Sequence, residues 1–124
     1  MRKYDYTELV AWQRAMDLAV AVYQASDALP LEERFGLQAQ MRRSAVSISA
    51  NIAEGQGRRT CGEFLNQLSV AYGSLCELET HIHLAHRLAM MKEDVSKGIL
   101  DRTAEVGRLI NGLSRSLRTR TSEN

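Results

Sequence analysis

The residues of this chain that are best suited to chemistry are three closely spaced histidines, His81, His83 and His86. On a helix, His81 and His83 point about 200° apart, so they cannot share a metal ion. His83 and His86 do share a face with Glu79, but clusters of this kind are mostly surface residues. A di-iron site in a helical bundle needs Glu-x-x-His pairs, and no glutamate of the chain has a histidine three residues later. We therefore expect no metal and no cofactor.

Hydrolytic and phosphate-loop chemistry are also poorly supported. Ser44 or Ser47 could join a histidine and a carboxylate, but serines inside a helix usually bond to their own backbone. The segment 55–59, Gly-Gln-Gly-Arg-Arg, is too short for a phosphate loop. It reads either as a turn that ends a helix or as a phosphate contact made by Arg58 and Arg59. The sequence predicts a protein that is not an enzyme, with no catalytic residue.

Two helical stripes interleave across residues 40–57. One is apolar with four-three-four spacing, which is typical of a helix packed in a bundle: Met41, Ala45, Ile48 and Ile52. The other is polar with three-four-three spacing: Ser44, Ser47, Asn51 and Glu54. Serine and asparagine are poor helix formers, so a regular stripe of them indicates that these side chains have a structural or binding role.

We expect the polar stripe to form a hydrogen-bonded network with nearby polar side chains: Arg43, Glu77, Glu79 or Thr80. The alternative is that the stripe lines a cavity or pore shared between subunits. In either case Asn51 and Glu79 should be buried or interfacial. Gly73 and Ser74, inside a helical repeat, predict the close approach of another backbone, because an interior glycine costs about 1 kcal/mol relative to alanine.

The basic residues are mostly arginine and unevenly spread. The net charge is only +1, yet 13 of the 16 basic residues are arginine, and four lie between positions 108 and 120 with no acid before Glu123. These cations suit a solvated helix end, where they oppose the helix dipole. They also suit a nucleic-acid contact, because arginine forks onto phosphate oxygens. The candidate contacts are Arg58, Arg59, Arg115, Arg118 and Arg120.

Periodicity and breaks predict an all-α, antiparallel, up-down-up-down four-helix bundle, as one domain over residues 1–124. The expected helices are 6–28, 33–55, 60–90 and 93–117, with flexible ends at 1–5 and 119–124. Asp5 with Glu8, and Thr60 with Glu63, have capping-box spacing. Leu29-Pro30 ends the first helix. Gly55 and Gly57 are expected to end the second in a left-handed conformation.

The apolar repeats predict which helix faces meet in the core. The expected residues of the first helix are Leu9, Trp12, Met16, Ala19 and Tyr23. Those of the third helix are Phe64, Leu68, Ala71, Leu75, Leu78, Ile82, Ala85 and Ala89. Those of the fourth helix are Val95, Ile99, Val106, Ile110, Leu113 and Leu117.

The bulk composition favours a cytoplasmic protein with no membrane partner. No apolar run approaches the ~20 residues of a membrane helix, and no signal-peptide apolar region follows the N-terminus. Cys61 and Cys76 would lie about 22 Å apart along one helix, so they cannot form a disulfide within the chain.

Two runs together resemble one family. Arg-Arg-Ser-x-x-Ser-x-x-x-Asn-Ile-x-Glu-Gly from residue 42, and Gly-Ser-Leu-x-Glu-Leu-Glu-Thr from residue 73, are similar to the 23S rRNA-intervening-sequence proteins, or S23 family, which are small bacterial four-helix proteins. The resemblance spans about residues 6–117. It includes Val-Ala-Trp-Gln from residue 10 and five residues that precede the main motif: Pro30, Glu33, Phe35, Leu37 and Gln40.

The resemblance implies an assembly rather than an activity. Related accessory proteins of diversity-generating retroelements are barrel-shaped homopentamers that engage a reverse transcriptase and nucleic acid, although this chain is less basic than they are. We therefore expect a homo-oligomer of five subunits that contacts RNA or DNA through a basic rim. The alternative is a protein–protein adaptor with no nucleic-acid role. Apolar residues left outside the core repeats are the expected subunit contacts: Val10, Val22, Leu65 and Leu109.

Overall fold

The computed structural model describes residues 5–123, with side-chain surroundings for residues 5–120. Four α-helices and two short 3-10 helices follow one another along the chain. They are η1 (Tyr6–Glu8), α1 (Val10–Ser26), η2 (Leu31–Glu33), α2 (Leu37–Gln56), α3 (Cys61–Arg87) and α4 (Glu93–Glu123). The described residues contain no strand. The predicted all-α class is confirmed.

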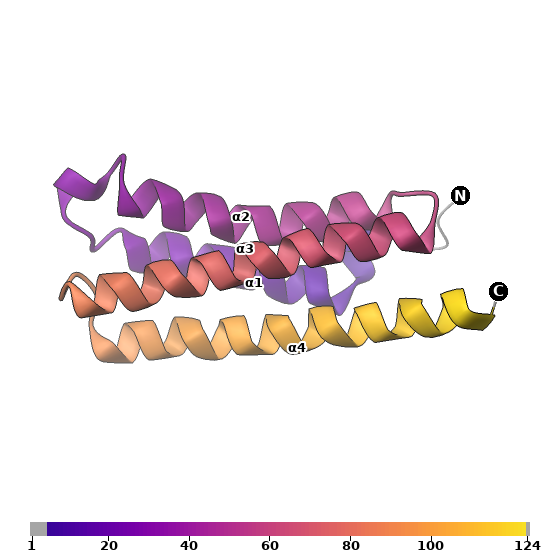
Figure 1. The fold of residues 1–124 in the computed structure, drawn as a ribbon. Helices are drawn as coiled ribbons and strands as arrows, with labels where there is room; N and C mark the ends of the chain where they lie inside the picture. Colours follow the sequence, from indigo (N-terminus) through magenta and orange to yellow (C-terminus); the bar gives the residue numbers. More distant parts are fainter. Residues whose placement is uncertain (1–4, 124) are drawn as a thin grey trace.

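The helices run up, down, up and down in one bundle (Figure 1). Each packs on its neighbour in sequence, and α4 closes the bundle against α1. The α1–α2 and α3–α4 connections lie at one end, which we call the connection pole. The start of α1, the α2–α3 turn and the end of α4 lie at the other end, which we call the open pole. The short connections explain this order, because a few residues can only join antiparallel neighbours.

The helix ends differ most from the predicted ones at the starts of α1 and α2 and at the ends of α3 and α4, and α3 ends at Arg87 rather than at 90. Helices α1 and α2 each begin four residues later than predicted, because the short 3-10 helices η1 and η2 precede them. Asp5 therefore caps the 3-10 turn, accepting a hydrogen bond from the Thr7 amide at 3.1 Å, rather than α1 itself. At the other end, the expected flexible segment 119–124 is helical up to Glu123, because 118–123 contains neither glycine nor proline. The predicted flexibility of 1–4 and 124 lies outside the described residues.

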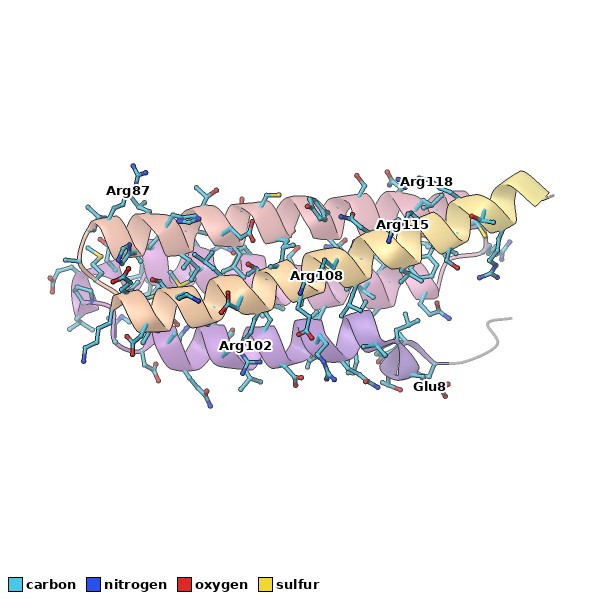
Figure 2. The ribbon with its side chains drawn as sticks, turned by 90° about the horizontal axis from the view of Figure 1, so that it is seen from below. Glu8, Arg87, Arg102, Arg108, Arg115 and Arg118 are labelled. Atoms are coloured by element: carbon cyan, nitrogen blue, oxygen red, sulfur yellow. The ribbon has the colours of Figure 1, made fainter. Side chains whose placement is uncertain are left out.

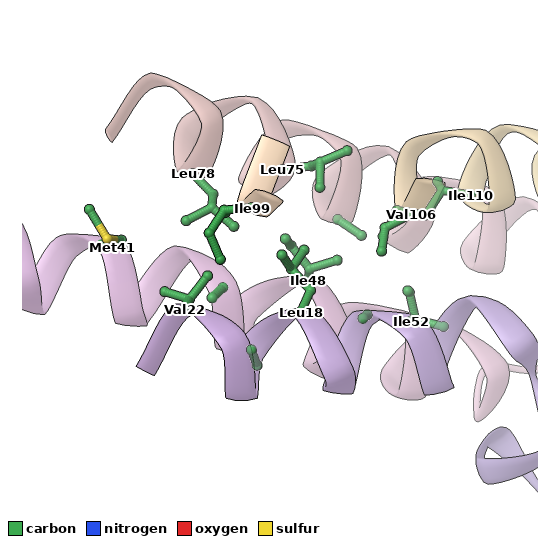
Figure 3. Packing of buried hydrophobic residues seen from close by; sticks show 14 of the residues in the cluster. Leu18, Val22, Met41, Ile48, Ile52, Leu75, Leu78, Ile99, Val106 and Ile110 are labelled. Carbon is green, nitrogen blue, oxygen red and sulfur yellow. The ribbon is translucent and has the colours of Figure 1, made fainter. Parts of the chain in front are cut away.

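The core lies between matching apolar stripes (Figure 3). The four predicted core residues of α2 are completely buried. The first seven residues of the predicted α3 repeat are also buried, and none is more than 9% exposed. Four of the six predicted residues of α4 are buried as well, and Val95 and Leu113 are half-buried. Burial of this kind stabilises a bundle by about 1.5–3 kcal/mol for each large side chain.

The prediction for α1 is wrong in its orientation. Its inner face consists of small and medium side chains, Ala11, Ala15, Leu18, Ala19 and Val22. Of the predicted core residues, Leu9 and Ala19 are buried, Trp12 is half-buried against Tyr6, and Met16 and Tyr23 are exposed. The sequence shows two apolar stripes on this helix, and the larger side chains belong to the outward one.

The glycines also differ from prediction. Gly55 stays inside α2, where an added Cβ would lie 2.7 Å from Phe64 Cδ1, so glycine is needed for close packing there. Gly57 ends the helix with φ −82°, which is not left-handed. Gly73 lies in an unbroken α3, and a Cβ there would meet nothing within 4 Å, so no backbone approaches it within the described chain. The close helix–helix approach falls instead at Gly107, where a Cβ would be 3.1 Å from Leu75.

The end of α3 contains the one left-handed residue described, Ala89, with φ 59°. Its amide donates to His86 O at 3.0 Å, and the Met90 amide donates to Ala85 O at 2.9 Å. This pair of bonds is a Schellman motif, which usually has glycine at the left-handed position. Ala89 was predicted as a core residue of α3, but it is exposed in the connection to α4.

We expect Ala89→Gly to raise the free energy of unfolding by up to about 1 kcal/mol, because glycine has no Cβ to strain the left-handed backbone. Urea denaturation followed by circular dichroism measures the change. Ala104→Gly, at an exposed position inside α4, is the matched control and should lower stability by about 1 kcal/mol. Destabilisation by both variants would show that Ala89 is unstrained.

Candidate functional site

A short polar network lies between α2 and α3. Ser47 Oγ and Ser74 Oγ are 2.9 Å apart across the two helices. Asn51 Nδ2 donates to Ser47 O at 2.7 Å and lies 3.0 Å from Ser47 Oγ. All three side chains are half-buried. We call Ser47, Asn51 and Ser74 the polar seam. It joins the two sequence runs singled out above, because α2 and α3 are antiparallel neighbours.

The other residues expected in one network do not join the seam. Ser44 is buried but donates to its own backbone, at Met41 O. Glu54 is exposed and contacts Arg58 and Gln67 at the open pole. Arg43, Glu77 and Thr80 are exposed. The single network predicted from sequence is therefore three separate groups, because the stripe turns gradually from the core towards solvent along α2.

Glu79 forms the third group, on the opposite side of α3. The Thr103 hydroxyl lies 2.6 Å from Glu79 Oε2 and 2.9 Å from Leu100 O. Thr103 is completely buried and Glu79 is half-buried, so this contact ties α3 to α4. Asn51 and Glu79 were expected to be buried or interfacial. Both are half-buried, and their partners are Ser47 and Thr103. Sequence reasoning did not single out Thr103, because one threonine in an apolar repeat carries no pattern.

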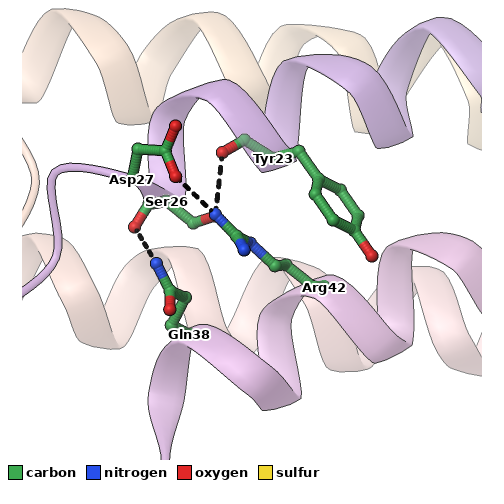
Figure 4. Close-up of polar contacts among 5 residues, drawn as sticks. All are labelled: Tyr23, Ser26, Asp27, Gln38 and Arg42. Carbon is green, nitrogen blue, oxygen red and sulfur yellow. Dashed lines mark hydrogen bonds and ion pairs between the residues drawn. The ribbon is translucent and has the colours of Figure 1, made fainter. Parts of the chain in front are cut away.

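Arg42, rather than the predicted Arg43, is the arginine that holds two helices together (Figure 4). Its Nε donates to Ser26 Oγ at 2.8 Å, and its terminal nitrogen donates to Tyr23 O at 3.2 Å and to Asp27 Oδ1 at 2.7 Å. The guanidinium also lies 4.6 Å from the centre of the Tyr23 ring. Gln38 Nε2 donates to Ser26 O at 2.9 Å. Two side chains of α2 therefore satisfy carbonyls at the end of α1.

The candidate nucleic-acid residues gather at the open pole. Arg58 and Arg59 follow α2, while Arg115, Arg118 and Arg120 lie near the end of α4, and all five are exposed. Figure 2 shows Arg115 and Arg118 along the last part of α4.

Acidic side chains reduce the net positive charge of the open pole. Arg58 makes an ion pair with Glu54 at 2.5 Å, and Glu63 follows one turn into α3. Glu8 lies at the same end of the bundle (Figure 2). The other basic residues of this pole are Arg59 and the arginines near the end of α4.

The model of one protein family matches residues 7–112, described as 23S rRNA-intervening sequence protein. The chain belongs to the 23S rRNA-intervening sequence protein family.

A solved crystal structure has the same fold as the chain. It is a protein of unknown function from the S23 ribosomal protein family of Bacteroides thetaiotaomicron. The TM-score is 0.79 at 24% sequence identity, over 85% of this chain and 98% of that one. No curated protein is similar in sequence to the chain.

The three histidines lie in two kinds of surroundings. His83 and His86 are exposed, whereas His81 is half-buried and its Nε2 has no hydrogen-bond partner within the described residues. Across residues 5–123, histidine, cysteine and acidic side chains form no group of three that could hold a metal ion. In the same part of the chain, every helix is too short or too polar to cross a bilayer.

We expect Arg42→Met to lower the free energy of unfolding by about 1–3 kcal/mol, because Tyr23 O and the buried Ser26 hydroxyl lose a donor. The ion pair itself adds little, since the Asp27 side chain is 80% exposed. Arg42→Lys should recover only part of the loss, because an ammonium cannot reach three acceptors as a planar fork. Urea denaturation measures all variants.

Arg43→Met is the matched control for Arg42→Met, because the neighbouring arginine is exposed. Its change should stay within about 0.5 kcal/mol of the parent. Equal losses for the two variants would contradict the assigned role of Arg42.

Proposed function

We propose that this protein is a non-enzymatic homo-oligomer, a closed ring of five subunits, whose open poles together contact nucleic acid. The number five rests on the resemblance to accessory proteins of diversity-generating retroelements. The observation that carries the proposal is the orientation of α1. Met16, Val20 and Tyr23 of this helix face solvent in one subunit, which is unfavourable unless another molecule covers them.

The outward face of α1 continues onto α2. Val20 is 55% and Tyr23 43% exposed, and Met16 lies one turn before Val20. The Arg42 contacts fix the antiparallel register, which brings exposed Val46 of α2 beside Val20. We call Met16, Val20, Tyr23 and Val46 the apolar face. None of these four residues is charged, and the Arg42 guanidinium that lies over the Tyr23 ring is already paired with Asp27.

A second surface on α3 supports a ring rather than a two-fold dimer. Gly73 reduces helix stability by about 1 kcal/mol and faces open space, so nothing within the subunit requires it. Close approach of a second subunit would explain why glycine is present at position 73. Exposed Val70 lies one turn before it. When two different surfaces of each subunit meet, the contact is heterologous, and such contacts form a ring when the rotation between subunits closes. Of the apolar residues expected in the interface, Val22 is buried in the core instead.

We expect Val20→Glu with Val46→Glu to convert the assembly to smaller species, because two carboxylates would be buried without partners. Sedimentation equilibrium at micromolar concentration measures the mass. Ala104→Glu, on the exposed surface of α4, is the control and should leave the mass unchanged. A parent protein that sediments as a monomer would rule out the ring.

The variant Gly73→Ala tests the subunit contact on α3 in the same sedimentation experiment. It should stabilise the separate subunit by up to about 1 kcal/mol and still weaken the assembly, because the added Cβ occupies the space of the neighbouring backbone. A more stable and equally associated variant would show that Gly73 has no part in the contact.

The nucleic-acid role rests on the shared position of the arginines. Arg59, Arg115 and Arg120 lie at one pole, so five subunits multiply a modest charge into a basic rim. This arrangement lets a chain with a net charge of +1 bind phosphates through counterion release. The bond between Arg58 and Glu54 opposes it and favours the alternative, a protein–protein adaptor. The resemblance suggests a reverse transcriptase as the partner of such an adaptor.

We expect structured RNA and duplex DNA to be retained at ~50 mM salt, with affinity falling about 40-fold by ~200 mM if three phosphates are neutralised. The change Arg115→Gln, Arg118→Gln and Arg120→Gln should remove most of the retention. Filter binding with both probes measures this, while sedimentation checks that the assembly is intact.

The matched control for that experiment neutralises three cations at the connection pole instead, as Arg34→Gln, Arg87→Gln and Lys97→Gln. Equal losses for the two triple variants would contradict the assigned rim. No retention by the parent at ~50 mM salt would put the adaptor function first.

A further inference from the structure

Two exposed residues of opposite charge, Arg43 on α2 and Glu77 on α3, have no partner within their own subunit. The ion pairs in the described part of the chain are formed by other side chains, and neither residue is among them. Arg42, the preceding residue of α2, differs because it already bonds three acceptors at the end of α1. The charges of Arg43 and Glu77 are therefore available to another molecule.

The polar seam fixes the height of α2 against α3 along the bundle. Because Ser47 and Ser74 meet across the two helices, their neighbours Val46 and Gly73 also lie at one level. The helices are antiparallel (Figure 1), so one turn back along α2 and one turn on along α3 both lead towards the connection pole. These steps reach two residues that share a second level, about 5 Å from the first. The two residues are Arg43 and Glu77.

A ring keeps these levels. The open poles can share one rim only if the ring axis runs along the helices, and rotation about such an axis moves no residue up or down. When the apolar face of one subunit packs against the surface around Gly73 of the next, Arg43 of the first comes to the level of Glu77 of the second. The positive charge of one subunit and the negative charge of its neighbour are thus brought to the same height.

The two charged residues also lie on the same side of that contact. Around the bundle, α2 stands between the apolar face and the surface around Gly73. The subunits of a ring narrow towards its axis, so α2 lies on the axis side. Arg43 is one turn from Ser47, which faces α3, and Glu77 is one turn from Ser74, which faces α2. Both charges therefore lie on the axis side, where they alternate around the ring.

Side-chain size is matched at the neighbouring levels. Val46 is 44% exposed and has glycine, at position 73, as its counterpart on α3. One turn towards the open pole the order is reversed, with exposed Ala50 on α2 and Val70, which is 47% exposed, on α3. A large side chain meets a small one at both levels, so α2 of one subunit can approach α3 of the next closely.

No other charged group of these helices competes at the level of the pair. The other charged residues of α2 and α3 lie more than two turns away or face α1 or α4: Glu54, Glu63, Arg87, Arg42 and Glu79. Both aspartates at the side and end of α1 are already in ion pairs, Asp17 with Arg14 and Asp27 with Arg42. The neighbouring subunit therefore offers Arg43 one carboxylate at its own height.

We propose that Arg43 of each subunit forms an ion pair with Glu77 of the next subunit, on the axis side of their contact. This inference rests on the proposed ring and names the residues that decide which surfaces meet. An apolar contact alone lets two apolar faces pair with each other around a two-fold axis. That arrangement would bring together two arginines at position 43, so the charges oppose it and favour the heterologous contact.

Sedimentation equilibrium of the full chain at micromolar concentration tests the pair. Arg43→Glu alone and Glu77→Arg alone should each weaken the association on the order of 10-fold per contact, because like charges then face each other. The double variant carries opposite charges in exchanged positions and should return to the parent mass. Both side chains are exposed and unbonded within the subunit, so the variants keep their fold, and the urea stability of the dissociated subunit should not change.

Mixing the two single variants tests whether the pair joins different subunits. Each variant carries the same sign of charge at both positions, so a negative subunit can pair well only with a positive one. An equimolar mixture should therefore assemble further than either variant alone. In a ring of five, one contact stays mismatched, so the mixture should recover less mass than the double variant.

Arg102→Glu, on the exposed surface of α4, makes the same change of charge away from the contact and should leave the mass unchanged. Parent-like masses for the two single variants, or a mixture no larger than its components, would overturn the pair and leave the ring standing. A parent that sediments as a monomer would instead remove the ring, and the pair with it.

Discussion

The close packing of α2 on α3 is the constraint on which the other elements depend. At the turn between them, Gly55 accepts the Phe64 ring at a distance that no side chain would allow. Further along, Ser47 and Ser74 meet at 2.9 Å. A half-buried polar pair of this kind costs more when it is broken than it contributes when formed, so it fixes the register of the two helices. With that register set, α1 and α4 need only cover the remaining apolar stripes.

The thin inner face of α1 follows from this arrangement. A helix that covers two closely packed partners has little room, so alanine recurs where leucine stands on α3. The larger side chains are thereby displaced to the outside, where Val20 and Tyr23 remain exposed. Arg42 compensates for the limited apolar contact by bonding the last carbonyls of α1 directly to α2. The features of the surface are consequently separated in space, with an apolar side, a basic end and a second end formed by the connections.

Most of the fold could be predicted from the sequence, because three of the four helices carry one dominant apolar stripe. Thr60 also caps α3 as expected, because its hydroxyl oxygen accepts a hydrogen bond from the Glu63 amide at 3.1 Å. The orientation of α1 could not be predicted, because the helix carries two apolar stripes. The stripe with the bulkier side chains was predicted to face the core, and it faces outwards. The left-handed residue was missed because Ala89 stands where glycine is expected.

Only the part of the candidate site that follows from the topology of the bundle could be predicted. The ends of α2 and α4 share a pole in any up-down-up-down bundle, so the arginines could be grouped from topology alone. Contacts between single polar residues were not accessible, since Arg42 and Arg43 are indistinguishable in sequence and only the helix rotation selects one. Thr103 and Glu79 are likewise paired by a rotation that no pattern records.

The closure of α4 against α1 has a consequence for the order in which the chain folds. All other helix pairs are neighbours in sequence and can zip together across short connections. Closing α1 onto α4 alone joins the two ends of the chain, so this step carries the longest loop closure and its entropy cost. The interface contains alanines from α1, which supply little hydrophobic free energy to offset that entropy. On a ribosome, α1, α2 and α3 emerge before α4 and can associate first. The rate of the last step is then set by the synthesis and docking of one long helix.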